Sequence, residues 1–594
     1  MCGIAGQIRF DGRRADVGLI TDITSEMAER GPDGAGVWSQ GPIALGHRRL
    51  SIIDLSHHGD QPMVDAELGL TVVFNGCIYN HRDLRRELER AGYRFFSSCD
   101  TEVLLKAYHY WRQDFADHLI GMFAACIVER DSGRAVLVRD RLGIKPLYVA
   151  EQPGALHFAS SLPALLRVPG LDTSVDPEAL HHYLTFHAVV PAPLTMLRGV
   201  RKVEPGTMVM LEPDGTRKDY SYWNPPRFPS DTRVVADPID WVDAVEAALR
   251  LAVERRLVAD VPVGVLLSGG VDSSVIVGMM SEAGQHGLST FSIGFESIGD
   301  EAGDEFRYSD LVARHFGTDH HQIRVSNERV LEVLPDAIHA MNEPMVSHDL
   351  VAFYMLSEQV ARSHKVVQSG QGADEVFGGY HWYQTLHATD PGADSAEAYA
   401  QVFFDRTRAE VAAVVADEHL APSDVSRDFV ARHFAELNGA SAAEQAMHLD
   451  THVMLVDDPV KRVDSTTMAH GLEARVPFLD HELVELAFSC PTDLKLAQGG
   501  KGVLKEVARR VVPSEVIDRP KGYFPVPPLT YLEGPYVDLM RQALHSDAAR
   551  SRGLFRPEMM DHLLEHPNEL TTLRYNQLWE LGLLELWLQS HDIA

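Results

Sequence analysis

Hydrophobic and polar positions follow two different patterns along the chain. Within residues 1–205, short β-branched segments alternate with turns, and this predicts strands over Leu70–Phe74, Ala124–Glu129 and Ala135–Arg139. The Asp-Ser-Gly-Arg sequence at 131–134 is typical of a hairpin turn between the last two strands. Interspersed helices are predicted wherever apolar residues recur at three- and four-residue steps, over Val17–Arg30, His81–Ala91 and Thr101–Trp111. We therefore expect an α+β domain whose sheets are covered by helices.

Beyond residue 240 the pattern changes to a regular alternation of strand and helix. Such an alternation predicts a parallel, doubly wound sheet that binds ligands at the carboxyl ends of its strands. The predicted strands are Val263–Leu267, Thr290–Phe295, Gln322–Val325 and Val366–Gln368. The predicted helices are Trp241–Leu257, a helix from Ser273, Tyr308–Phe316 and Glu328–Met341.

A linker is predicted between the two regions. Residues 206–240 are rich in Pro, Gly, Asp and Arg, as in the Trp-Asn-Pro-Pro-Arg-Phe-Pro-Ser sequence at 223–230. This places one domain at 1–205 and a second at 241–594. The stretch from 386 to 450 has a helical pattern but contains no motif that indicates a function.

The composition narrows the range of partners. The chain has 594 residues, of which 45% are hydrophobic and 23% are charged, as in ordinary globular proteins. Its net charge of −31 opposes attraction to nucleic acid or anionic lipid, so an anionic ligand needs a local basic pocket. There is neither a long uncharged apolar run nor a basic-then-apolar leader, so we expect a cytoplasmic protein without a membrane segment. The number of subunits stays open, with a homodimer compatible with the sequence.

Cysteine usage points to a reactive thiol. The five cysteines are Cys2, Cys77, Cys99, Cys126 and Cys490. They are few, odd in number and never spaced as CxxC, which argues against a disulfide framework and against a zinc site of four thiolates.

Cys2 is a candidate nucleophile because removal of Met1 would make it the first residue. Its α-amine, with an ordinary pKa of about 7.7 to 8.0, would then lie beside its own thiol, with an ordinary pKa of about 8.5. One residue could thus supply both nucleophile and base.

Further motifs of the first region resemble those of class II glutamine amidotransferases. They are Met1-Cys-Gly-Ile-Ala-Gly6, Arg-Gly-Pro-Asp-Gly at 30–34, Gly-His-Arg-Arg-Leu-Ser-Ile-Ile-Asp at 46–54, Phe-Asn-Gly-Cys-Ile-Tyr-Asn at 74–80 and Asp-Thr-Glu at 100–102. The resemblance implies an N-terminal-nucleophile αββα sandwich in which Cys2 attacks the glutamine side-chain amide and releases ammonia. It also implies that Asn75 and the Gly76 amide form the oxyanion hole. Arg49 would bind the glutamine α-carboxylate and Asp100 its ammonium group.

The Val-Leu-Leu-Ser-Gly-Gly-Val-Asp-Ser-Ser sequence at 265–274 is the second chemical feature. An apolar strand runs through Ser-Gly-Gly into a helix, which directs backbone amides and hydroxyls at one point on the positive end of that helix. The chain has no Walker A sequence. The loop instead resembles the pyrophosphate loop of N-type ATP pyrophosphatases, and this implies ATP contacts from Leu267, Ser268, Gly269, Gly270, Asp272, Ser273, Ser274, Ile293, Ser369 and Gly370.

Two carboxylates and one lysine complete this predicted site. Asp272 and Asp374 lie just past predicted strands and are candidate Mg²⁺ contacts, since that ion prefers hard oxygen ligands. Positive charge gathers late in the chain, in Gly-Leu-Glu-Ala-Arg-Val-Pro-Phe-Leu-Asp at 471–480, Gly-Lys-Gly-Val-Leu-Lys at 500–505 and Arg-Pro-Lys-Gly-Tyr-Phe at 519–524. By resemblance, Lys501 would stabilise charge in the adenylating and amidating transition states.

The order of these blocks resembles that of glutamine-hydrolysing asparagine synthetases over nearly the whole length. The implied reaction is adenylation of an acceptor carboxylate by ATP, with release of pyrophosphate, followed by attack of ammonia delivered from the first domain. ATP and Mg²⁺ are the implied cofactors, and the implied substrates are glutamine, ATP and the acceptor.

Two positions depart from the family pattern. Cys77 and Gln371 stand where the family usually has glutamate. A thiol cannot replace a negative charge at neutral pH unless its pKa is depressed, and an amide at 371 alters the charge of the acceptor site. With these two residues the chain resembles the N-acetylglutaminylglutamine amidotransferases. The acceptor is therefore open between aspartate and an acetylated dipeptide, and the two departures favour the dipeptide.

Three other functions stay open at this point. A glutamine-dependent phosphoribosyl transferase also begins with cysteine, but the Ser-Gly-Gly-Val-Asp-Ser-Ser loop disfavours it. Thiolation of tRNA is disfavoured by the acidic charge and the missing CxxC. A degenerate, non-catalytic binding or regulatory protein would explain Cys77 and Gln371 as marks of lost activity.

Overall fold

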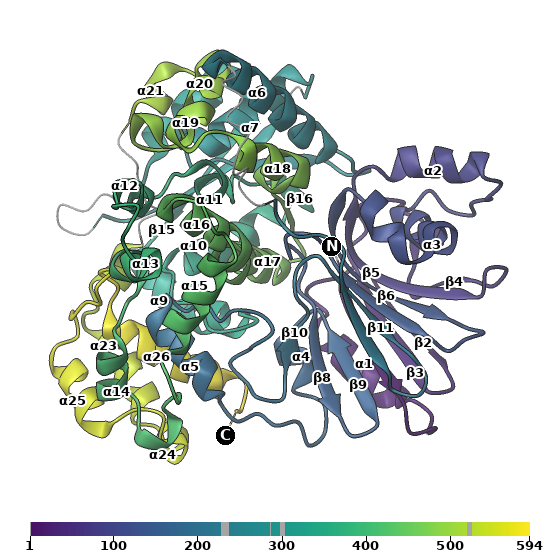
Figure 1. The fold of residues 1–594 in the computed structure, drawn as a ribbon, viewed down its shortest axis with the longest axis horizontal. Coiled ribbons are helices and arrows are strands. Elements are labelled where there is room, and N and C mark those ends of the chain that lie inside the picture. The colour runs from purple at the N-terminus through teal and green to yellow at the C-terminus, as the bar shows by residue number, and fades with distance from the viewer. Residues whose placement is uncertain (1, 227–236, 286, 298–302, 520–525, 594) are drawn as a thin grey trace.

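The computed structural model describes residues 2–226, 237–285, 287–297, 303–519 and 526–593. It shows a strand-rich N-terminal body beside a larger, mainly helical body, and the N-terminal end of the chain lies where the two bodies meet (Figure 1). No helix within the described ranges is both long enough and apolar enough to cross a membrane.

The first body consists of two antiparallel sheets packed face to face. In spatial order one sheet contains β10 (Arg201–Lys202), β8 (Tyr148–Gln152), β9 (Ala155–Ala159), β1 (Gly3–Arg9), β3 (Ile43–Arg49) and β2 (Gly34–Gln40). The other contains β12 (Arg217–Ser221), β11 (Thr207–Leu211), β7 (Ala135–Arg139), β6 (Gly121–Glu129), β5 (Leu70–Ile78) and β4 (Met63–Asp65).

Helices cover the outer faces of these sheets. Buried residues of both sheets, including Ile4, Leu45, Val73 and Leu137, form one cluster between them. The covering helices are α1 (Val17–Ser25), α2 (His81–Arg90), α3 (Asp100–Trp111) and α4 (Leu162–Leu165), whereas α5 (Pro177–Thr185) packs against helices of the second body. The predicted αββα sandwich is confirmed, although α1 ends five residues before the predicted helix does.

The predicted linker is wrong over residues 207–221. These residues form β11 and β12, and β11 pairs with β7 from Met208↔Val138 to Leu211↔Ala135. Pro213, Asp214 and Gly215 lie in the turn at 212–216 between the two strands, and residues 227–230 of the quoted sequence at 223–230 lie outside the described residues. Turn residues between two short strands give the same composition as a linker, so composition alone could not distinguish the two.

The second body is built on a five-stranded parallel sheet. Its order is β15 (Asp319–Val325), β14 (Ser289–Phe295), β13 (Val263–Leu266), β16 (Val366–Gln368) and β17 (Glu473–Arg475). The four predicted strands are present, and β17 is an additional strand that the sequence pattern did not reveal. Helices around the sheet include α6 (Pro238–Arg255), α7 (Val271–Glu282), α8 (Phe306–Phe316), α9 (Asn327–His339), α10 (Asp349–Val360), α11 (Ala373–Phe377), α17 (Lys461–Met468), α18 (His481–Ser489), α19 (Thr492–Leu496), α20 (Gly502–Val511) and α21 (Ser514–Ile517).

Two further groups of helices extend this body. The uninterpreted stretch from 386 to 450 is helical, as expected, and belongs with α12 (His381–His387), α13 (Ser395–Phe403), α14 (Arg408–Val414), α15 (Val425–Ala435) and α16 (Ala442–Leu449). The C-terminal group contains α22 (Pro527–Thr530), α23 (Pro535–Leu544), α24 (Asp547–Arg552), α25 (Pro557–Glu565) and α26 (Gln577–Ser590). Figure 1 shows this second group at the end of the body that lies farthest from α6 and α20.

Apolar clusters that contain residues of both bodies join them. Cys77, Tyr79 and Met122 of the first body belong to the same buried cluster as Leu267 and Val476 of the second. Since burial of apolar surface favours association by roughly 25 cal/mol per Å², this shared core holds the bodies against each other.

Candidate active sites

A narrow pocket forms around Cys2 at the junction of the bodies. It is lined by Cys2, just before β1, by Arg49 at the end of β3, by Gly76 on β5 and by Asp100 at the start of α3. Asn75 reaches the same place, because its side-chain Oδ1 accepts a hydrogen bond from the Cys2 backbone nitrogen at 3.0 Å. The fold thus brings together every residue predicted to act on glutamine.

Close packing explains the residue types at Asn75 and Gly76. A Cβ atom at Gly76 would lie 2.1 Å from the backbone oxygen of Met122, so only glycine fits between β5 and β6 there. The Asn75 Nδ2 donates to Ser160 Oγ at 3.4 Å, and Ser160 Oγ also accepts from the Ile4 amide at 3.1 Å. Ser160 therefore orients the asparagine, a role for which the sequence carried no signal.

The Cys2 thiol is protonated in this arrangement. Burial raises the pKa of the Cys2 thiol, and the hydrogen bond from the Leu50 backbone opposes this shift only in part. An attacking thiolate therefore needs a base nearby. Removal of Met1, which lies outside the described residues, would convert the backbone nitrogen that contacts Asn75 into an amine able to serve as that base.

Arg49 and Asp100 are held in fixed orientations by other groups. The Arg49 Nη1 donates to Ser56 O at 2.8 Å and to Asp60 Oδ1 at 2.7 Å. The Asp100 carboxylate accepts from the Ile78 amide at 3.0 Å and from the Cys99 thiol at 3.4 Å. Burial raises the pKa of Asp100, since removal from water disfavours its charged form.

The second body contributes two residues to this pocket, and neither was predicted. Glu473 and Arg475 of β17 line it together with Cys2. From the other side, Arg30 Nε contacts the Cys2 carbonyl oxygen at 3.4 Å while its Nη2 pairs with Asp464 of α17 at 2.9 Å. Arg30, Glu473 and Arg475 all belong to motifs that the sequence analysis singled out without giving these residues a role.

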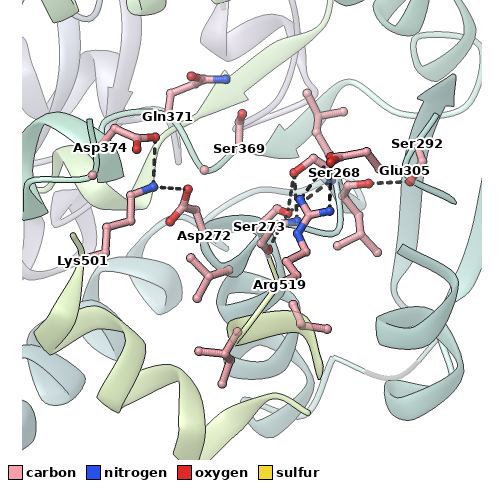
Figure 2. A pocket seen from close by; sticks show the side chains of 18 of the residues that line it. Ser268, Asp272, Ser273, Ser292, Glu305, Ser369, Gln371, Asp374, Lys501 and Arg519 are labelled. Atoms are coloured by element: carbon pink, nitrogen blue, oxygen red, sulfur yellow. Dashed lines mark hydrogen bonds and ion pairs between the residues drawn. The ribbon is translucent and has the colours of Figure 1, made fainter. Parts of the chain in front are cut away.

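A larger cavity of about 470 Å³ opens at the carboxyl ends of β13, β14 and β16 (Figure 2). This is the position predicted for ligands of a parallel sheet. The cavity is lined by the predicted residues Leu267, Ser268, Gly270, Asp272, Ser273, Ile293, Ser369, Gly370, Asp374 and Lys501, and also by Gln371.

Two predicted nucleotide contacts do not line the cavity. Gly269 faces α8 instead, with a φ of +75°, and a Cβ atom there would lie 2.6 Å from the Ser309 backbone nitrogen. Ser274 is fully buried in α7. Gly269 thus allows the close approach of the loop to α8, and Ser274 packs inside α7; a contiguous sequence motif does not distinguish these positions from the cavity lining.

The loop before α7 is preformed. Gly270 is the N-cap of this 12-residue helix, its amide donates to Ser268 Oγ at 3.3 Å, and the Ser268 amide donates to Ser273 Oγ at 3.2 Å. These contacts hold the loop at the positive end of the helix, where an anion such as a phosphate is stabilised.

Lys501 joins the two predicted Mg²⁺ contacts. Its Nζ lies 2.7 Å from Asp272 Oδ2 and 2.9 Å from Asp374 Oδ2 (Figure 2). Burial lowers the pKa of Lys501, but the two carboxylates outweigh this effect and raise it above its ordinary value. The Lys501 side chain passes so close to the backbone of Gly379 that a Cβ atom there would lie 2.3 Å from the Lys501 Cε.

The donor set fits a hard cation that also contacts the substrate. Asp272 and Asp374 line the cavity with side chains 21% and 23% exposed. No cluster of three or more His, Cys, Asp or Glu able to hold a metal occurs in the described part of the chain. Two carboxylates alone suit Mg²⁺, which commonly takes one or two carboxylates and completes its shell with phosphate oxygens and water.

Arg519 and Glu305 form an ion pair in the lining of the same cavity (Figure 2). The Arg519 Nη1 and Nη2 lie 2.9 and 3.1 Å from the two Glu305 carboxylate oxygens, and the guanidinium lies 4.4 Å from the Tyr308 ring centroid. Arg519 begins the third basic motif of the sequence, whose residues 520–524 lie outside the described ranges. Arg519 places a further positive charge close to Gly270 in the loop before α7.

Comparison with known proteins gives a consistent result. The asparagine synthase family model matches residues 244–589, and the glutamine amidotransferase domain model matches residues 1–223. Asparagine synthetase [glutamine-hydrolyzing] 1 of Bacillus subtilis strain 168 is 30% identical over 99% of this chain and 96% of its own length. A putative asparagine synthetase [glutamine-hydrolyzing] of Mycobacterium tuberculosis H37Rv is 31% identical over 89% of this chain and 88% of its own. A glutamine phosphoribosylpyrophosphate amidotransferase structure from B. subtilis aligns at 15% identity, with a TM-score of 0.30, over 56% of this chain and 92% of its own.

Proposed function

The chain belongs to the asparagine synthase family in its glutamine-hydrolysing form, and on that premise we propose that the Cys2 pocket and the nucleotide cavity carry out two halves of one amide-forming reaction. It is a glutamine-dependent carbon–nitrogen ligase that uses ATP. The observation that carries this proposal is the apolar cluster that contains both Cys77, which lines the first pocket, and Leu267, which lines the second.

In the first half, the Cys2 sulfur attacks the side-chain carbonyl carbon of glutamine. The thiol proton passes to the α-amine of Cys2 and then to the leaving nitrogen, so that ammonia departs and a γ-glutamyl thioester remains. Asn75 and the Gly76 amide donate to the developing oxyanion, and such donors are worth about 3 kcal/mol each. Arg49 and Asp100 hold the α-carboxylate and ammonium groups of glutamine. Water then hydrolyses the thioester to glutamate and frees the sulfur.

In the second half, the acceptor carboxylate attacks the α-phosphorus of ATP and pyrophosphate leaves. The Ser268–Ser273 loop binds phosphate oxygens through its amides and hydroxyls, and Lys501 neutralises the charge that develops there. Asp272 and Asp374 would hold Mg²⁺, which would supply further neutralisation of that charge when bound. Ammonia then displaces AMP from the activated acyl group to form the amide.

The apolar cluster between the sites supports internal transfer of ammonia. Free ammonia in neutral water becomes mostly ammonium, which has no lone pair for attack. Residues such as Met122 and Val476, which lie in the buried core between the bodies, keep a transferred molecule uncharged because ionisation without water is costly.

For the acceptor we favour an acylated dipeptide of the N-acetylglutaminylglutamine type over aspartate. Gln371 lines the nucleotide cavity with a neutral amide. An acceptor with a free ammonium group would lose a counter-charge at this position, whereas an N-acylated acceptor has no ammonium group that requires one.

One pair of assays tests both the reaction and the acceptor. AMP formation in the presence of glutamine and ATP is measured with aspartate and with N-acetylglutaminylglutamine, for the native chain and for Cys2→Ala. We expect AMP formation with the dipeptide, and loss of glutamine-dependent but retention of ammonia-dependent synthesis in Cys2→Ala. Turnover with aspartate alone contradicts the acceptor assignment. Absence of glutamine hydrolysis in correctly processed protein supports the non-catalytic alternative.

A further inference from the structure

One buried residue of the second body belongs to both sites at once. The Arg475 side chain is fully buried and lines the Cys2 pocket. Its backbone oxygen accepts a hydrogen bond at 2.9 Å from the amide of Ser369, and Ser369 lines the nucleotide cavity. The strand pairing is equally direct, because Arg475 lies opposite Gln368 in the parallel ladder of β16 and β17.

The Arg475 guanidinium is held rigidly on one side only. Its Nε donates to Glu473 at 2.5 Å, and its Nη1 donates to the backbone oxygens of Arg256 and Val258 at 2.9 and 2.7 Å. Nη2 has no hydrogen-bond partner among the residues that the structure describes. Since the guanidinium is planar and its donors diverge in fixed directions, the three occupied acceptors fix the direction in which Nη2 is available.

Apart from Glu473, which accepts from Nε, the described neighbours Cys77 and Tyr79 supply no anion for the Nη2 donor. Cys77 also lines the pocket and interacts electrostatically with Arg475, but its buried thiol is neutral, and the Tyr79 ring centroid lies 5.7 Å from the guanidinium carbon. A buried donor without a partner is a costly state that a bound acceptor relieves. Glutamine brings carboxylate and amide oxygens into this pocket.

We propose that Arg475 is a positioning residue that couples the glutamine pocket to the nucleotide cavity, by donating from Nη2 to bound glutamine while its backbone holds Ser369. This inference rests on the proposed function. Bound glutamine would fix the position of β17, and β17 would in turn fix Ser369, which lines the nucleotide cavity. By thermodynamic reciprocity, a nucleotide that favours the same position of β16 and β17 increases the affinity for glutamine by the same factor.

The test compares glutamine hydrolysis with and without a nucleotide. Glutamate release is measured over a range of glutamine concentrations, in the absence of acceptor, with and without a non-hydrolysable ATP analogue. In the native protein we expect the analogue to lower the KM for glutamine at least about fivefold, the lower end of typical coupling between sites. In Arg475→Lys, which keeps the charge but loses the fork, we expect the ratio of the two KM values to fall to near one.

A matched control separates coupling from structural damage. Arg256→Lys alters another buried arginine at the same junction, whose guanidinium contacts the Tyr79 ring and pairs with Asp480 but does not line the Cys2 pocket. This variant is expected to keep the native KM ratio. Equal loss of the ratio in both variants, or a native-like ratio in Arg475→Lys, overturns the inference.

A second variant leaves Arg475 in place. Cys77→Glu introduces a carboxylate beside the guanidinium, which should occupy Nη2 permanently, so the KM for glutamine should no longer respond to the analogue. A persistent response overturns the inference even if Arg475→Lys does not fold. Ammonia-dependent amide synthesis by the native protein is measured in parallel. If that synthesis is absent, the proposed function fails. If synthesis is present but the KM for glutamine still responds to the analogue in Arg475→Lys, only this inference is contradicted.

Discussion

Replacement of Lys501 by methionine tests the proposed chemistry of the nucleotide cavity most directly. The ammonium group lies 2.7 and 2.9 Å from the carboxylates of Asp272 and Asp374, and its side chain is 8% exposed. Methionine keeps most of the length of the side chain but removes its charge. Two carboxylates then face the cavity where the phosphates of ATP must bind.

The contacts allow the size of the effect to be estimated. At an effective dielectric constant of 20, each of the two ion pairs has a Coulomb energy of about 6 kcal/mol, before the cost of desolvation is subtracted. Both carboxylates keep about a fifth of their exposure, so water can replace part of the lost partner. Loss of a preorganised charge-stabilising group typically costs about 3–4 kcal/mol in the transition state, which corresponds to a loss of about 100- to 1000-fold in the adenylation rate.

Exchange of labelled pyrophosphate into ATP in the presence of acceptor measures this step alone. Glutamine hydrolysis by Lys501→Met should remain native, because Lys501 does not line the Cys2 pocket. Arg509→Met is the matched control, since Arg509 lies on α20, the helix that begins directly after Lys501, but pairs with Asp518. A loss of exchange below tenfold in Lys501→Met, or an equal loss in Arg509→Met, would refute the assignment of Lys501.

Three further predictions concern the rest of the molecule. Gly76→Ala should reduce glutamine hydrolysis at least about 100-fold and spare ammonia-dependent synthesis, since its Cβ would meet a backbone oxygen at 2.1 Å and displace an oxyanion donor; kinetics with the two nitrogen sources measure this. Asp464→Asn should lower the free energy of unfolding by about 3 kcal/mol at neutral pH. Burial raises the pKa of Asp464, but Arg30 and Lys145 outweigh burial and lower it below the ordinary value. The stabilisation by this carboxylate is therefore present at neutral pH and lost as the pH falls below about 4. Urea unfolding of both proteins at pH 7 and at pH 3.5 measures the loss of stability and its pH dependence. Burial raises the pKa of Asp450 from 3.8 to about 6, although hydrogen bonds from three aromatic side chains oppose this shift. The free energy of unfolding should therefore decrease on the order of 3 kcal/mol as the pH rises from about 4 to about 6. In Asp450→Asn the free energy of unfolding should not show this decrease.

The fold was largely predictable because many of its strands are buried and apolar and its turns carry their own residue signals. The segment Ala135–Arg139 is fully buried, and the predicted strand there coincides with β7. The strand β12 could not be predicted in the same way, because Arg217–Ser221 is polar and mostly exposed. Its place in the sheet depends on pairing with β11, which is a long-range property that local periodicity does not contain.

The candidate sites were predictable where one motif supplies one side of a pocket. The loop around Ser268 and the strand residues Asn75 and Gly76 are of this kind. Ser160 and Glu305 lie outside the quoted motifs, and only folding brings them beside Asn75 and Arg519. A sequence without aligned relatives gives no means to link positions so far apart along the chain.

The segment Glu473–Arg475 shows why a recognised motif can still conceal its function. In a strand, residues two apart point to the same face, so the sequence already implies that Glu473 and Arg475 act together while Ala474 points away. It does not say which domain that face meets. Because β17 is the edge of the parallel sheet that pairs with β16, its side chains reach the first body while its backbone remains bonded to the nucleotide loop. A three-residue strand can therefore serve two reactions although its side chains reach only one of the two pockets. The first measurement on a substitution at 475 should be the effect of the nucleotide on the KM for glutamine, before either activity is measured alone.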